Sequence, residues 1–79
     1  MENTPRLDPK ISEAILRVMH SAEPLETKEV EDALLELDHD VSRSIVFYRL
    51  QDLRAKGLVK GKFVGPGKGV WIWWKNNGK

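Results

Sequence analysis

The sequence predicts an α+β domain in which three helices, with a short strand between the first two, precede a two-stranded β-hairpin. Apolar residues recur at helical spacing as far as about residue 57, after which the period changes to two. A Gly-Pro-Gly-Lys-Gly stretch at residues 65–69 then separates two strand-like segments. The 79 residues suffice for one domain, which we expect at residues 8–75 between flexible tails at 1–7 and 76–79.

The first helix is expected at residues 9–22. Asp8 and Pro9 form a helix start, because an Asp side chain can accept a backbone N–H and Pro suits the first helical position. Pro24 ends the helix, since a residue that precedes proline avoids the α region. The apolar face consists of Ile11, Ala14, Ile15, Val18, Met19 and Ala22.

Residues 25–26 are long enough only for a brief edge strand. Thr27 is expected to cap a second helix, and the Asp-His-Asp stretch at residues 38–40 is expected to form the turn that follows it. The second helix has one apolar face, made of Val30, Ala33, Leu34 and Leu37.

A third helix follows, with Asp40 or Ser42 as its N-cap and Gly57 as a left-handed residue at its end. Residues 58–64 and 70–75 are rich in Val, Phe, Ile and Trp, which favour strands, so they form the hairpin. The buried stripe of the third helix is expected to be Ile45, Val46, Leu50 and Leu53, with the aliphatic stem of Arg49.

Residues 41–59 carry the pattern Val-x-x-x-Leu-x-x-Leu-x-x-x-Gly-Leu-Val after a serine-rich start. This pattern resembles the run from recognition helix into wing in the winged helix-turn-helix superfamily, a set of DNA-binding domains of many transcription regulators. The resemblance covers about Pro9 to Trp74. It implies the order α-β-α-α-β-β, with the third helix in the major groove and the hairpin wing on the flanking backbone or minor groove.

Charge is divided unevenly along the chain. Residues 1–40 carry four basic and eleven acidic side chains, a formal −7, whereas residues 41–79 carry nine basic side chains and one acidic, a formal +8. The formal net charge of +1 therefore hides a basic half that a polyanion would find attractive. This half also contains the third helix and the hairpin, which indicates nucleic acid as the partner.

The exposed side of the third helix is expected to contact double-stranded DNA. Arg43 can bridge guanine O6 and N7, and Gln51 can bridge adenine N6 and N7. Of the two adjacent aromatics, Phe47 is expected to be half-buried against the wing and Tyr48 to face the groove. Solvated charges and simple ring packing are the alternatives. The predicted DNA-binding residues here are Ser42, Arg43, Ser44, Phe47, Tyr48, Gln51 and Arg54.

The hairpin adds Lys60, Lys62 and Lys68 to the predicted DNA-binding residues. Lys60 and Lys62 share one strand face, being two residues apart. Lys68 lies at the tip between glycines, so the backbone there can approach a sugar-phosphate closely. Lysines that protect an edge strand from aggregation are the alternative.

The second strand of the hairpin places Val70, Ile72 and Trp74 on one face and Trp71 and Trp73 on the other. Only one face can pack on the helices, so some tryptophan surface should be exposed. We assign Trp71 and Trp73 to a candidate dimer or partner surface. A shelf covered by Lys and Phe63 side chains and a base-stacking surface remain alternatives.

The second helix carries carboxylates outside its apolar face. Only Thr27 and Lys28, at its N-terminal end, suit a phosphate. The acidic face can fix which side of the molecule meets DNA, can bind a protein partner, or can be a solvated surface with acids in the early turns. The carboxylates are Glu29, Glu31, Asp32 and Glu36.

No catalytic or cofactor chemistry is predicted. Cysteine is absent, and His20 and His39 lie on different elements without a paired carboxylate at metal-ligand spacing. The glycine-rich stretch precedes a strand, so it is no phosphate-binding P-loop. Neither a signal peptide nor an apolar run of membrane length is apparent, so we expect a cytoplasmic, nucleoid-associated protein.

The function predicted from the sequence is sequence-specific binding of double-stranded DNA by a small transcription regulator, without cofactor or metal. A homodimer is a candidate form, because tight specific binding by so small a module is expected to need two copies. The alternative is a winged-helix module for protein–protein contact in a replication or transcription assembly, with the partner bound through the acidic second helix.

Overall fold

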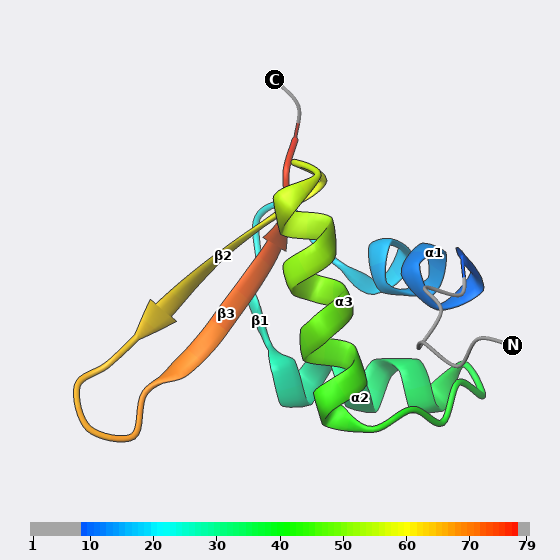
Figure 1. The fold of residues 1–79 in the computed structure, drawn as a ribbon, viewed down its shortest axis with the longest axis horizontal. Coiled ribbons are helices and arrows are strands. Elements are labelled where there is room, and N and C mark those ends of the chain that lie inside the picture. Colours follow the sequence, from blue (N-terminus) through cyan, green and yellow to red (C-terminus); the bar gives the residue numbers. More distant parts are fainter. Residues whose placement is uncertain (1–8, 78–79) are drawn as a thin grey trace, which may run out of the picture.

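Three helices and a three-stranded antiparallel sheet make up residues 9–77, the part of the chain that the computed structural model describes (Figure 1). The α+β class and the order of the six elements are as the sequence predicts. The expected tail at residues 1–7 and the capping role of Asp8 lie outside the described residues. The elements are α1 (Pro9–Val18), β1 (Leu25–Glu26), α2 (Thr27–Glu36), α3 (Arg43–Ala55), β2 (Val59–Val64) and β3 (Val70–Lys75).

Strand β3 is the centre of the sheet, whose order is β1-β3-β2. β2 pairs with β3 along its whole length, and the brief β1 pairs with β3 through Leu25 opposite Trp73 and Glu26 opposite Ile72. In Figure 1 the hairpin lies on one side of α3 and α1 on the other, and the hairpin tip extends beyond the helices.

The hydrophobic core receives side chains from all three helices and from the hairpin. Trp73 is the largest of the fully buried side chains among the described residues, so the hairpin is an integral part of the core. The Arg49 stem is buried, as expected, whereas Ile45 is only half-buried. The buried apolar residues are Ile11, Ala14, Ile15, Met19, Val30, Leu34, Val46, Leu50, Leu53, Val59 and Trp73.

Helix α1 is shorter than the sequence predicts, ending at Val18 instead of Ala22. The backbone N–H of Met19 still bonds to the carbonyl of Ile15 at 3.1 Å, but the carbonyl of His20 accepts the backbone N–H of Lys75 at 2.8 Å. The chain therefore leaves the helix to join the end of β3, and Ala22 is exposed.

Helix α2 begins differently from the prediction. Glu26, not Thr27, is its N-cap, and the Glu29 carboxylate accepts the backbone N–H of Glu26 at 2.7 Å. Thr27 is the first helical residue, which leaves its hydroxyl available to a side chain elsewhere. Leu37, expected on the buried face, follows the helix as its C-cap and is 42% exposed.

The ends of α3 agree with the prediction. Ser42 is the N-cap, and its Oγ accepts the backbone N–H of Ile45 at 3.3 Å. Gly57 has a φ of 81°, the left-handed conformation that favours glycine at a helix end. Asn76, which the sequence assigns to the tail, donates its side-chain N–H to the Gly57 carbonyl at 2.7 Å. The contacts of the domain thus reach residue 76.

Within residues 9–77, each helix is too short and too polar to cross a lipid bilayer.

Candidate functional site

The polar face of α3 lies opposite its buried stripe. Val46, Arg49, Leu50 and Leu53 turn into the core. The predicted DNA-binding positions turn outward: Arg43, Ser44, Tyr48 and Arg54 are exposed, while Phe47 and Gln51 are half-buried.

The two adjacent aromatics of α3 divide as expected. Phe47 meets the rings of Trp71 and Trp73 edge-on, with centroids 6.0 and 5.7 Å apart, so it joins α3 to β3. Tyr48 is 53% exposed.

A row of aromatic rings fixes the hairpin beside α3. Trp71 stacks on Trp73 with centroids 5.1 Å apart, and Phe63 meets Trp71 edge-on at 6.1 Å. The guanidinium carbon of Arg54 lies 5.6 Å from the centre of the Trp71 ring, a cation–π contact. The side of β3 that carries Trp71 therefore borders the polar face of α3.

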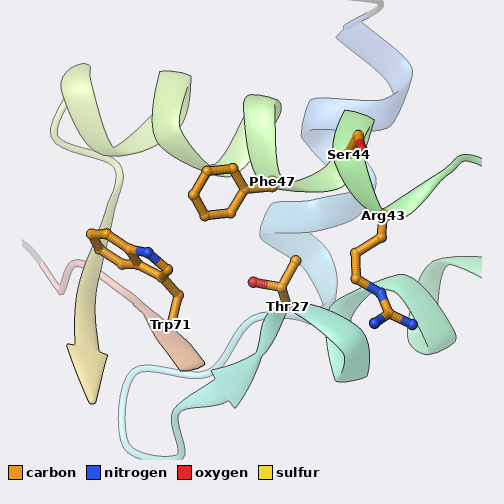
Figure 2. Close-up of a pocket in the computed structure, with 5 residues that line it drawn as sticks. All are labelled: Thr27, Arg43, Ser44, Phe47 and Trp71. Carbon is orange, nitrogen blue, oxygen red and sulfur yellow. The ribbon is translucent and has the colours of Figure 1, made fainter. Parts of the chain in front are cut away.

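A shallow groove runs from the start of α2, past the first turns of α3, to β3. One part has a volume of about 460 Å³ and the other about 370 Å³. Both parts share Thr27, Arg43 and Trp71, so we treat them as one α2–α3–β3 groove. Figure 2 shows Phe47 and Arg43 projecting from α3 on either side of Thr27, with Phe47 on the side of Trp71. Apolar rings line one end and hydrogen-bonding groups the other.

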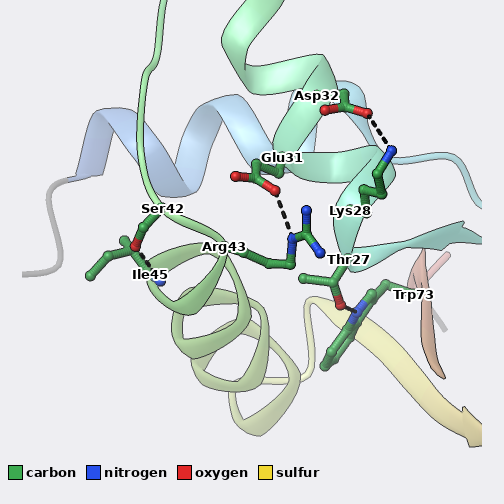
Figure 3. A network of polar contacts seen from close by, with 8 residues as sticks. All are labelled: Thr27, Lys28, Glu31, Asp32, Ser42, Arg43, Ile45 and Trp73. Carbon is green, nitrogen blue, oxygen red and sulfur yellow. Dashed lines mark hydrogen bonds and ion pairs between the residues drawn. The ribbon is translucent and has the colours of Figure 1, made fainter. Parts of the chain in front are cut away.

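Three of the four carboxylates of α2 have local partners, two of them near this groove (Figure 3). Arg43 donates its Nε–H to Glu31 Oε1 at 2.8 Å, and Lys28 lies 3.6 Å from Asp32. Glu29 is occupied at the helix start. The repulsion that four acidic side chains on this helix would exert on a phosphate is therefore partly neutralised.

The register of the hairpin separates the lysines from α3. Lys60 lies opposite Trp74 and Lys62 opposite Ile72, on one face as predicted. Trp71, which borders α3, belongs to the other face, because side chains alternate along a strand. Lys60 and Lys62 therefore lie on the face of the hairpin that does not border α3, and DNA contact by these two lysines stays a prediction. Lys68 is exposed in the loop between β2 and β3.

The predicted partner surface of Trp71 and Trp73 is wrong for Trp73, which is fully buried. Its indole Nε1 donates to Thr27 Oγ1 at 2.8 Å, so this face of β3 packs on the helices. Trp71 is half-buried beneath Arg54 and Phe47. The outer face, with Val70 exposed and Trp74 half-buried, is the one that meets solvent.

Sequence reasoning missed two contacts made by groove residues: that of Arg43 with Glu31, and that of Thr27 with Trp73. Each pair joins elements that only the fold brings together, so no local pattern could have found it. Among residues 9–77, no group of three or more His, Cys, Asp or Glu side chains is placed to hold a metal ion.

No protein-family model matches this chain, and no curated protein sequence matches it. The function must therefore be argued from the geometry above.

Proposed function

We propose that this chain is a winged helix-turn-helix domain that binds double-stranded DNA with sequence preference, as a small transcription regulator. The observation that carries the proposal is the outward polar face of α3, with Arg43, Gln51 and Arg54 on one helix flanked by a hairpin that Phe47 and Trp71 hold in place. An exposed helix beside a projecting hairpin can meet a major groove and the adjoining strand together.

In this proposal α3 enters the major groove. Arg43 at its first turn and Gln51 near its middle offer the bidentate donors and acceptors that suit guanine and adenine edges. Each good bidentate pair contributes about 1–3 kcal/mol of discrimination against the wrong base. Tyr48, exposed beside them, can reach a phosphate through its hydroxyl.

The flanking contacts would come from the hairpin tip and the helix starts. Lys68, which is exposed in the loop, would contact a phosphate or the minor groove. Thr27 and Lys28 lie where α2 begins, and Ser42 where α3 begins, so backbone N–H groups there can meet phosphates. So small a module buries little surface on DNA, and tight specific binding is expected to need two copies.

A salt titration of binding to a random-sequence duplex tests the proposal. With Lys28 and Lys68 on phosphates, affinity should fall by about tenfold between about 50 and 200 mM salt, because bound cations release counterions from the DNA. Fluorescence anisotropy of a labelled duplex measures it. Absent binding, or binding that does not change with salt, would contradict the proposal.

Substitutions separate base contacts from phosphate contacts. Arg43→Ala and Gln51→Ala should relax sequence preference, whereas Lys68→Ala should weaken all duplexes alike. Arg17→Ala removes the same charge from the exposed side of α1, away from the groove, and serves as the control. Equal effects of Lys68→Ala and Arg17→Ala would remove the hairpin tip from the interface.

The second candidate function is a protein–protein module. It is favoured by Leu35 and Leu37, which are 55% and 42% exposed at the acidic end of α2. Exposed apolar side chains next to Glu36 and Asp38 suit a partner with a basic, amphipathic surface. The same salt titration distinguishes the two candidates, since this module would not bind a random duplex.

A further inference from the structure

We propose that Glu31 is a positioning residue for DNA recognition by Arg43. It holds the guanidinium so that the outer end, with the two Nη groups, faces the ligand, and its negative charge weakens binding to duplexes of every sequence. The inference rests on the proposed function and adds a residue from a different helix to the recognition site.

The contact between the two side chains is short and asymmetric. Arg43 Nε lies 2.8 Å from Glu31 Oε1, within the range of charge-assisted hydrogen bonds. The Glu31 side chain is 26% exposed and that of Arg43 is 57% exposed. The carboxylate is thus the more enclosed partner and the arginine side chain the more exposed one. Figure 3 shows their contact between α2 and α3.

The choice of Nε decides which donors are left for a ligand. A guanidinium has five N–H groups, of which four belong to the two Nη atoms. Within residues 9–77 the Nη groups of Arg43 make no hydrogen bond. They can therefore approach guanine O6 and N7 end-on, as a pair. Because Glu31 already restricts the long side chain, less conformational entropy is lost when the contact forms.

The charge of Glu31 acts in the opposite direction. A carboxylate beside the phosphates repels any duplex, whatever its sequence. In a duplex with guanine at the right position, the contact with Arg43 offsets this repulsion. In duplexes of other sequence nothing offsets it. Glu31 should therefore lower affinity for random DNA while it raises selectivity. An ion pair that served only stability would leave the selectivity of the folded protein unchanged.

The test compares two quantities in Glu31 variants. One is the dissociation constant for a random duplex. The other is selectivity, the ratio of dissociation constants for a duplex selected by the wild-type chain and the same duplex with each guanine replaced in turn. Glu31→Ala should bind the random duplex more tightly but lose about fivefold in selectivity at one guanine, part of what a bidentate contact provides. Glu31→Gln keeps an oxygen that can accept the Nε–H, so it should bind random DNA more tightly with selectivity near wild type.

Glu36→Ala is the matched control, since it removes the same charge from an exposed position on α2. It should tighten random binding without a loss of selectivity. If Glu31→Ala loses no more selectivity than Glu36→Ala, the inference is overturned while the proposed function stands. The double variant Arg43→Ala/Glu31→Ala should be no less selective than Arg43→Ala alone, and a further loss would also overturn it.

An NMR measurement without DNA checks the contact itself. The Arg43 Nε–H signal should exchange slowly with water in the wild type and rapidly in Glu31→Ala, whose cooperative thermal unfolding confirms that the variant is folded. Equal exchange rates would overturn the positioning role. If the wild-type chain binds no duplex, the proposed function fails and this inference fails with it.

Discussion

At the residue scale, one hydrogen bond joins the hairpin to the start of α2. Trp73 is fully buried, and Thr27 Oγ1 accepts its indole N–H at 2.8 Å. A Thr→Val change at this position keeps the shape but removes the acceptor, and a buried donor without a partner costs about 1–3 kcal/mol. Urea denaturation of Thr27→Val should show the free energy of unfolding lowered by about that amount.

Thr27→Ser is the reverse change, since it retains the hydroxyl and removes the methyl group. It should stay within about 0.5 kcal/mol of the wild type, as most substitutions without a lost interaction do. Similar losses for both variants would mean that the hydrogen bond contributes nothing to stability.

Gly61 is the second residue-scale constraint, because it lies directly opposite Trp73 in the sheet. A Cβ at this position would stand 2.5 Å from two carbons of the indole ring. The ring cannot move aside, since Phe47 and Trp71 flank it. Gly61→Ala should therefore lower the free energy of unfolding by about 1–3 kcal/mol, the usual effect of overpacking, as measured by urea denaturation.

Gly65→Ala is the control for this prediction. An added Cβ there meets its nearest side-chain atom, in Phe63, at 3.7 Å, an ordinary contact. Its stability should stay near that of the wild type. A Gly61→Ala variant as stable as Gly65→Ala would show that Trp73 adjusts more freely than its packing indicates.

At the element scale, the start of α3 depends on its cap. Ser42 Oγ accepts the Ile45 N–H, so Ser42→Ala leaves the first turn without this bond and should lower the free energy of unfolding by about 1 kcal/mol. Amide hydrogen exchange should quicken at Arg43, Ser44 and Ile45. Because Arg43 is a proposed base contact, the same change should also reduce sequence preference.

Ser44→Ala provides the comparison, because it changes the same residue type two positions further along the chain. Its hydroxyl is exposed and makes no hydrogen bond within residues 9–77, and Ala is the better helix former. Stability should be unchanged or slightly higher. An equal loss in both serine variants would remove the special role of the cap.

At the scale of the whole molecule, the hairpin completes the core. Val59 and Trp73 are buried against the helices, and β1 pairs with β3. A chain that ends at Gly57 loses these side chains and the partner of β1. We expect it to show no cooperative thermal transition by circular dichroism, since so small a domain has little core to spare.

A chain that ends at Asn77 is the matched comparison. It keeps the bonds from Asn76 to Gly57 and Leu58, so it should melt cooperatively, near the temperature of the full chain. Cooperative melting of the shorter chain would show that the helices fold without the hairpin.

The order of the elements could be predicted from the sequence, because each depends on local rules. Helical spacing predicts the buried stripe of α3, a serine predicts its start, and Gly57 predicts its end. The change of period predicts the hairpin. These signals lie within a few residues of the structure that they predict, so no knowledge of the fold is needed to read them.

Only the tertiary structure decided which face of β3 packs on the helices and which residues meet in the groove. The alternation of Trp71 and Trp73 with Ile72 and Trp74 allows either face to be buried, and the choice depends on Gly61 and Thr27, which are distant in sequence from Trp73. The early end of α1 and the ion pair of Arg43 with Glu31 have the same origin. Such contacts form between separate elements, whose relative positions are set by the packing of the whole core, so the sequence determined the elements and the fold determined the site.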